Sequence, residues 1–176
     1  TVALISGKAE LEEDASNLAI VLKNIISDEN RKRKFFNLIN DILPFVDEID
    51  VDSYSDKSLT FKLKEIYNKE KFIPASLLSD GTISITAIIV ALYFEKKSIA
   101  IIEEPERNIH PHLISKLVDM LNDAAGSKQI ITTTHNPEIV KYVDLNHLFL
   151  VSRDNKGFST IVKPVEKEEI KVFLNN

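Results

Sequence analysis

The sequence contains no cysteine and no tryptophan, and its 176 residues include only four glycines and one methionine. Without cysteine, the chain can form neither a disulfide framework nor a thiolate metal site. No apolar run reaches the length of a membrane-spanning helix, and the N-terminus lacks the basic and apolar pattern of a signal peptide. We therefore expect a cytoplasmic protein.

The composition is that of an ordinary soluble globular chain, with 44% hydrophobic and 28% charged residues. The net charge of −5 argues against a surface that binds nucleic acid everywhere, but it leaves room for a local basic patch. One basic run occurs, Arg31-Lys-Arg-Lys34. Four consecutive helical residues point all round the axis, which favours a solvated helix start over a DNA contact.

Apolar periodicity divides the chain into two predicted parts. Residues 1–71 are expected to form helices and a β-hairpin, and residues 72–176 an alternating strand–helix lobe. The expected helices cover residues 16–26, 29–43, 82–94, 111–125 and 170–174, with a further brief helix that ends at Tyr142. A short apolar strand followed by an acidic turn is expected within residues 1–14, and the main expected strands cover 46–54, 58–67, 99–102, 129–134, 147–152 and 158–162. Asp14 or Ser16 is the expected N-cap of the first helix.

An acidic segment follows one of these strands. Ile99–Ile102 is an unbroken apolar run that ends in Glu103 and Glu104. Such a run is typical of a parallel strand covered on both faces, and these sheets place ligands beyond the carboxyl ends of their strands. Two carboxylates at a buried strand's end are costly unless a cation, a water or an active site uses them.

Two further groups carry chemistry. Leu78-Ser-Asp-Gly-Thr82 precedes a helix, where Ser79 and Thr82 offer hydroxyls and Gly81 allows close backbone approach. This set suits a phosphate, although such a sequence is more often only a helix cap. Thr132-Thr-Thr-His-Asn136 ends a strand with hydroxyls and His135, which can reach a ligand at the mouth of a neighbouring strand.

The order of these motifs resembles the second half of an ABC-type ATPase of the SMC/RecF-like branch, closest to the OLD-type AAA-family ATPases. Phe72–Thr82 looks like the signature motif of that family. The acid-Glu-Pro-Glu segment continues through Asn108-Ile-His-Pro111, close to the family's Leu-His-Pro. The resemblance implies an α/β fold: a parallel sheet core flanked by helices, plus an N-terminal helical and β-hairpin subdomain.

The resemblance also implies a role for each matching residue. The signature residues would contact the γ-phosphate of a nucleotide held mainly by the opposite protomer. The acids would position the metal ion and the attacking water. In that assignment Ser79, Gly81 and Thr82 bind nucleotide. Glu103 steers Mg²⁺ through its water shell, and Glu104 is the general base. His135 is the switch histidine, and Glu106 and Asn108 lie in the D-loop at the dimer interface.

The function implied is ATP hydrolysis with Mg²⁺ in a homodimer, in DNA repair or phage defence, with DNA as a further partner. Two features depart from the family pattern. Glu103 stands where Asp is usual, and the sequence has no Gly-x-x-x-x-Gly-Lys-Ser/Thr phosphate loop. Ser6-Gly-Lys8 lacks the rest of that loop. We therefore expect a C-terminal lobe, cut from or split from its Walker A lobe and inactive alone.

Two alternatives belong to other classes. In the first, the chain is a protein or DNA interaction module whose ATPase motifs are vestigial. In the second, adjacent acids bind Mg²⁺ for phosphodiester cleavage, which requires Asp80 or Asp144 to converge on Glu103.

Overall fold

The computed structural model describes residues 2–4 and 8–164. The helix expected at residues 170–174 lies outside the described residues. The chain forms two compact units, Thr1–Thr133 and Thr134–Asn176.

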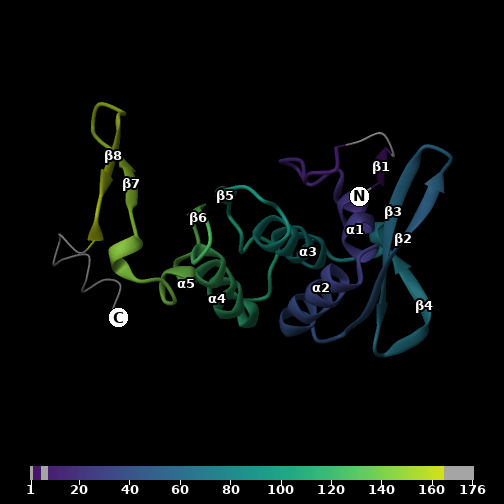
Figure 1. Ribbon diagram of the computed structural model, residues 1–176. Coiled ribbons are helices and arrows are strands. Elements are labelled where there is room, and N and C mark those ends of the chain that lie inside the picture. The colour runs from purple at the N-terminus through teal and green to yellow at the C-terminus, as the bar shows by residue number, and fades with distance from the viewer. Residues whose placement is uncertain (1, 5–7, 165–176) are drawn as a thin grey trace. The chain divides into compact units, whose positions relative to one another are not determined.

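An antiparallel sheet forms one side of the first unit (Figure 1). Strand β2 (Val46–Ser55) and strand β3 (Ser58–Glu65) make the predicted hairpin. Strands β1 (Val2–Leu4) and β4 (Asn68–Pro74) pair with successive parts of the other edge of β3. Alternate β3 side chains are buried, as predicted. Strand β4 was not predicted, because its first four residues, Asn-Lys-Glu-Lys, show no apolar alternation.

Helices α1 (Leu18–Ile26) and α2 (Glu29–Ile42) confirm the first two predicted helices. The expected N-cap of α1 was wrong, because Asn17 occupies that position and forms no side-chain cap. Its side chain is buried and instead holds the preceding loop. Asn17 Oδ1 accepts the Glu12 N–H, and Asn17 Nδ2 donates to the carbonyl oxygens of Lys8 and Glu10, at 2.7–2.9 Å.

Helix α3 (Asp80–Tyr93) lies in the middle of the first unit and is buried on most of its sides. It packs against α1, α2 and a further helix, α4 (Ile114–Ala125). One continuous core results, containing Leu18, Phe61, Ile89 and Leu117. The two compact units therefore meet after Thr133 and not at residue 72. The boundary expected at residue 72 was drawn on function, and it stays a prediction.

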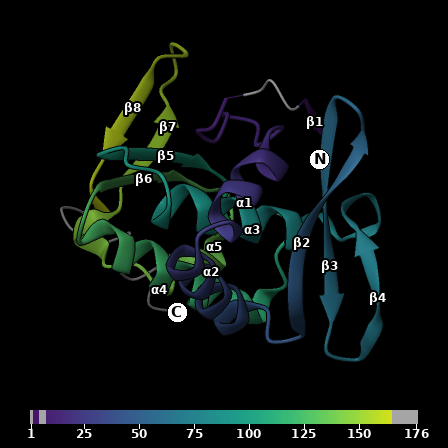
Figure 2. The ribbon, with the colours of Figure 1, turned by 45° about the vertical axis from the view of Figure 1, so that its right-hand side comes forward.

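Strands β5 (Ile99–Glu103) and β6 (Gln129–Thr133) form a parallel pair, joined through α4 (Figure 2). Their register aligns Ile99 with Gln129 and Glu103 with Thr133. A 3-10 turn, Pro111–Leu113, precedes α4, so the predicted helix at 111–125 is confirmed with an irregular start.

The expectation that this apolar strand is covered on both faces was wrong for the chain as it stands. Ala100 and Ile102 are half-buried, and Ile102 packs against the core. The opposite face is open, with Ile99 50%, Ile101 69% and Ile131 44% exposed. We call Ile99, Ile101 and Ile131 the open face.

The second unit begins with a short helix, α5 (Pro137–Val140), followed by a 3-10 turn at Leu145–His147. Strands β7 (Leu150–Arg153) and β8 (Ser159–Val162) form the predicted closing hairpin. Within residues 2–4 and 8–164, no helix has both the length and the apolar character needed to cross a membrane.

The three hydrogen bonds of Asn17 make it a test of how the loop before α1 is held. Asn17→Ala removes all three part-buried hydrogen bonds to the loop, so we expect a loss of about 1–3 kcal/mol in the free energy of unfolding. Asn24→Ala changes an exposed position of the same helix and serves as the matched control. Chemical denaturation measures both variants, and equal stabilities would contradict the role given to Asn17.

Candidate functional site

Ser79 is the N-cap of α3. Its backbone is extended, with φ −66° and ψ 147°, and its Oγ accepts the Thr82 N–H at 3.1 Å. Ser79 Oγ also lies 2.9 Å from Thr82 Oγ1. Ser79 is exposed whereas Thr82 is buried. The cap uses a lone pair of Ser79 and leaves the hydroxyl its proton, so capping and contact with a phosphate are chemically compatible.

Gly81, in the first turn of α3, is pressed against the backbone of the loop after β5. A Cβ at Gly81 would overlap the Asn108 carbonyl oxygen and lie 3.3 Å from the Asn108 carbonyl carbon. Only glycine fits such a close approach of two backbones. The structure thus brings two predicted site residues together within one chain, and this contact had no signal in the sequence.

Glu103 and Glu104 stand at the carboxyl end of β5, as predicted. Glu103 pairs with Thr133, and its side chain is on the same face of β5 as those of Ile99 and Ile101. Glu104 has a left-handed backbone, with φ 44°. Its N–H donates to the Thr133 carbonyl at 2.8 Å, and its carbonyl accepts the Arg107 N–H at 2.9 Å. A left-handed glutamate stores backbone strain, a feature that concentrates at functional sites.

The loop between β5 and α4 continues with Glu106 and Asn108. Glu106 is buried at 6% exposure, and its carbonyl accepts the Ile109 N–H at 3.0 Å. Asn108 is exposed and also left-handed, with φ 61°. Asparagine tolerates that conformation better than most residues. The loop thus holds the Asn108 backbone over α3 while its side chain faces solvent.

His135 belongs to the second unit and follows the end of β6 by two residues. The turn around it is ordered by its neighbours. Asn136 N–H donates to Thr134 Oγ1, and Asn136 Oδ1 accepts the Glu138 N–H as the cap of α5, both at 2.9 Å. Seven of the eight predicted site residues therefore lie in the first unit, while His135 lies in the second.

Metal ligands are sparse around these residues. Among the described residues, no three His, Asp or Glu side chains gather in a way that could hold a metal ion. A single carboxylate such as Glu103 suits Mg²⁺, which keeps several waters and takes its other ligands from phosphates. The described residues do not form the cluster of several acids that the phosphodiester alternative requires.

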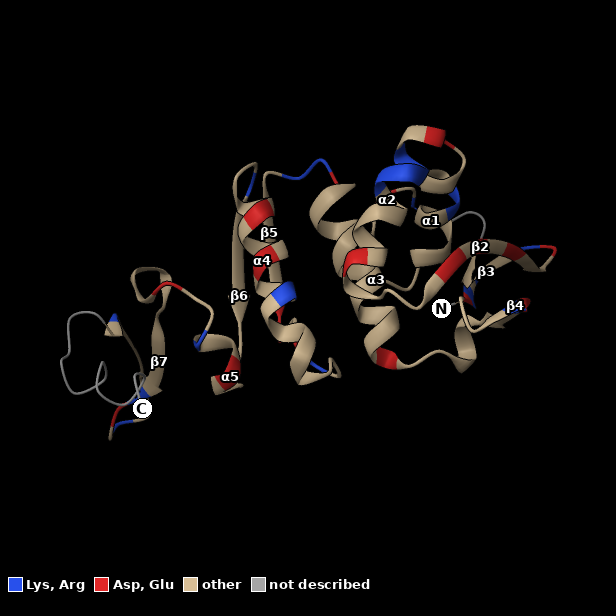
Figure 3. Cartoon of the chain, turned by 90° about the horizontal axis from the view of Figure 1, so that it is seen from below, with Lys and Arg blue, Asp and Glu red and all other residues tan. Residues whose placement is uncertain are grey.

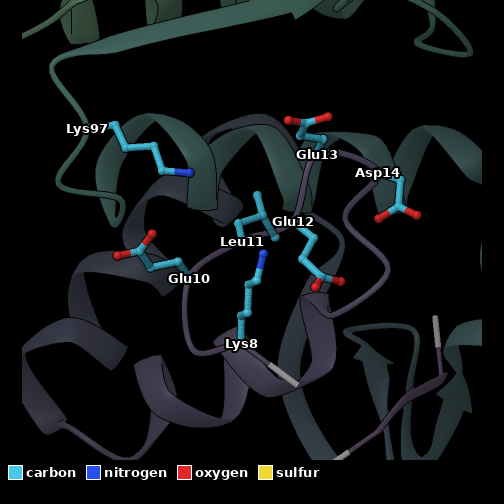
Figure 4. A pocket seen from close by; sticks show the side chains of 7 residues that line it. All are labelled: Lys8, Glu10, Leu11, Glu12, Glu13, Asp14 and Lys97. Carbon is cyan, nitrogen blue, oxygen red and sulfur yellow. The ribbon is translucent and has the colours of Figure 1, made fainter. Parts of the chain in front are cut away.

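A hollow of about 500 Å³ lies apart from the predicted site residues (Figure 4). It is lined by Lys8, Glu10, Leu11, Glu12, Glu13, Asp14 and Lys97. Four carboxylates against two ammonium groups make it unsuited to a phosphate, because like charges repel. Sequence analysis did not identify this hollow.

Comparison with known proteins gives a family. The family model described as "AAA domain, putative AbiEii toxin, Type IV TA system" matches residues 4–141. The chromosome partition protein Smc of Rhodopseudomonas palustris is 33% identical over 92 residues. That match covers 49% of this chain and 8% of the Smc protein, so the chain corresponds to a small part of it.

Solved structures of SMC heads share the fold. A structure from work on ATP-driven dimerization and DNA-stimulated activation of SMC ATPases has a TM-score of 0.65 at 13% identity, covering 90% of this chain and 95% of its own. The Smc head of Pyrococcus yayanosii has a TM-score of 0.63 at 14% identity, and the match covers 93% of this chain and 31% of that structure's chain. The Smc head bound to the C-winged helix domain of ScpA has a TM-score of 0.61 at 17% identity, and the match covers 90% of this chain and 47% of that structure's chain. The chain therefore has a mixed α/β fold similar to an SMC head domain.

The contact between Gly81 and Asn108 can be tested without any ligand. Gly81→Ala forces the two backbones apart, and we expect it to cost about 1–3 kcal/mol of stability, as overpacking does. Amide hydrogen exchange at Arg107 and Ile109 should also accelerate. Gly126→Ala is the milder comparison, because Gly126 has an ordinary helical φ of −64° and its added Cβ would make a tight contact with Asp123 O, at 3.2 Å, rather than an overlap. Unchanged exchange in Gly81→Ala would contradict the contact.

Proposed function

Because the chain belongs to the AAA domain family described as putative AbiEii toxin of type IV TA systems, we propose that it is the C-terminal lobe of an ABC-type ATPase head of the OLD/RecF-like group. Its activity, when completed, is hydrolysis of ATP to ADP and phosphate. The supporting observation is the carboxyl end of the β5–β6 pair. There Glu103 is the last residue of a parallel strand, Glu104 follows it, and the loop after them packs on the start of α3 through Gly81.

The signature residues fit a phosphate at the start of α3. The helix N-terminus supplies partial positive charge and unpaired N–H groups. Exposed Ser79 can donate its hydroxyl proton to a γ-phosphate presented by another protomer. Buried Thr82 then orients Ser79 through their 2.9 Å contact. Gly81 has no side chain, so the Asn108 backbone and a ligand can both approach the start of α3 closely.

The two acids have separate tasks. Glu103 would hold Mg²⁺ through coordinated water, and the ion would supply neutralisation of charge on the phosphates of the substrate ATP. Glu104 accepts a proton from the attacking water, and its fixed backbone limits where its carboxylate can reach. His135 approaches the γ-phosphate as the switch residue, and Glu106 and Asn108 shape the D-loop facing the second protomer.

A partner lobe completes the site in this proposal. The sequence lacks a phosphate loop, whose backbone amides and lysine supply most triphosphate binding in related enzymes. The open face provides apolar area for such a lobe, since parallel strands are ordinarily covered on both sides. The assembly proposed is a cytoplasmic homodimer that acts on DNA, in repair or phage defence.

The two acids can be separated experimentally in the complete ATPase. Glu104→Gln removes the base but keeps the shape, so we expect retained Mg-ATP binding, a dimer held in the ATP-bound state and turnover reduced on the order of 10²–10⁴-fold. Glu103→Gln should instead raise the Mg²⁺ concentration needed for half-maximal turnover. Equal effects of both changes on binding and turnover would favour a plain metal site. No effect of either would favour the interaction module.

The trans role of Ser79 needs mixed dimers. Ser79→Arg should block dimer closure, whereas a mere cap loss costs about 1 kcal/mol within one subunit. Mixing this variant with one that cannot bind nucleotide at its own Walker A site creates one intact composite site. Partial recovery of turnover is the expected result. Absence of recovery in verified mixed dimers, if one intact site suffices for turnover, would leave Ser79 as a cap only.

A further inference from the structure

The loop between β5 and α4 carries one cation that the proposed reaction does not use. Arg107 and Asn108 form the exposed tip of this loop, between buried Glu106 and buried Ile109. The Arg107 N–H donates to the Glu104 carbonyl at 2.9 Å, and the Ile109 N–H donates to the Glu106 carbonyl at 3.0 Å. Two hydrogen bonds and two buried side chains therefore hold the backbone from which the Arg107 side chain extends.

Arg107 is the only lysine or arginine in the three sequence segments that supply the predicted site. Residues 72–95, 98–115 and 132–136 contain no other. The first unit does contain a dense run of cations, but that run lies on α2 (Figure 3). In the part of the chain that the structure describes, the Arg107 guanidinium forms no ion pair with a carboxylate. Its charge is thus available to an anion.

The charge balance of the candidate site calls for such a cation. The predicted site residues and their immediate neighbours include four carboxylates, those of Asp80, Glu103, Glu104 and Glu106. Carboxylates repel the phosphates of a nucleotide. Part of this repulsion would be offset at the N-terminus of α3, and part by a magnesium ion held at Glu103. A guanidinium adds a further positive charge and a planar fork of N–H donors that matches two phosphate oxygens.

The fit between Gly81 and Asn108 indicates which phosphate Arg107 meets. A Cβ at Gly81 would overlap the Asn108 carbonyl oxygen, so the tip of the loop rests on the first turn of α3. Arg107 is one residue from this contact and Ser79 is two, and consecutive Cα atoms are about 3.8 Å apart. The arginine therefore stands beside the end of α3 at which Ser79 is proposed to meet a γ-phosphate from another protomer.

We propose that Arg107, together with Ser79, binds the γ-phosphate of the nucleotide held by the opposite protomer. The guanidinium donates hydrogen bonds to γ-phosphate oxygens, and its charge stabilises both the ATP-bound dimer and the negative charge on the phosphoryl group during transfer. ADP has no γ-phosphate, so this contact is lost after hydrolysis and phosphate release, and the dimer is then free to open. The inference rests on the proposed function, because it assigns a further residue to the same composite site.

The test separates dimer closure from nucleotide binding in the full-length protein. Glu104→Gln is the parent background, because slow turnover leaves ATP intact during the measurement. Arg107→Gln, Arg107→Lys and the control Arg33→Gln are each added to it, since Arg33 is an exposed arginine of α2 outside the proposed site. Sedimentation with Mg-ATP gives the dimer dissociation constant. A fluorescent ATP analogue, titrated at protein concentrations below that constant, gives the nucleotide affinity of single protomers.

We expect Arg107→Gln to raise the dimer dissociation constant at least about tenfold, because a charge-assisted contact is lost at each of the two sites. The nucleotide affinity of single protomers should stay unchanged. Arg107→Lys keeps the charge and should recover part of the closure, whereas Arg33→Gln should match the parent. With Glu104 restored, Arg107→Gln should also lower ATP turnover by roughly 10²-fold or more.

The contrary outcomes differ in what they overturn. An unchanged dimer dissociation constant in Arg107→Gln, or an equal rise in Arg33→Gln, would overturn the role given to Arg107 and leave the ATPase proposal intact. Weaker nucleotide binding by single Arg107→Gln protomers would place the arginine at its own protomer's nucleotide and overturn the contact across the interface. A Glu104→Gln parent without an ATP-dependent dimer would contradict the proposed function itself. Thermal melting confirms that each variant is folded.

Discussion

Enclosure of helix α3 is the constraint on which the larger unit depends. A helix that is apolar on most sides must be surrounded, and α1 and α2 cover it from one part of the chain while α4 covers it from another. The same helix carries Ser79 and Gly81 at its start, so the packing that encloses α3 also fixes the start of the candidate site. The loop after β5 is held against that start by the fit between Gly81 and Asn108.

Local patterns in the sequence were enough to predict much of the fold. The alternation Leu59, Phe61, Leu63 identified β3, the short apolar run identified β5, and the 3.6-residue period identified α1, α2 and α4. Ser79 was predicted as a cap from residue type alone. The parallel pairing of β5 with β6 followed from the strand–helix–strand order, and it places Glu103 beside Thr133.

Features that depend on distant partners could not be predicted in this way. Asn17 is polar and precedes a helix, yet it turns inward because the carbonyl groups of Lys8 and Glu10 need donors. Strand β4 exists because β3 offers a free edge, not because its own residues alternate. The close approach at Gly81 and the left-handed conformation of Glu104 arise from how one loop crosses a helix. The open face was missed because an apolar strand does not show what covers it.

The left-handed backbone of Glu104 places the stability of the protein in opposition to the proposed activity of this residue. Glycine and asparagine adopt φ 44° at lower cost than glutamate does, so either would relieve strain at this position. A selection for thermal stability alone would therefore replace the carboxylate with one of them. Retaining glutamate there lowers stability, a trade-off expected where a strained residue serves activity. Engineering a hardier version of this chain should accordingly leave residue 104 unchanged and gain stability elsewhere.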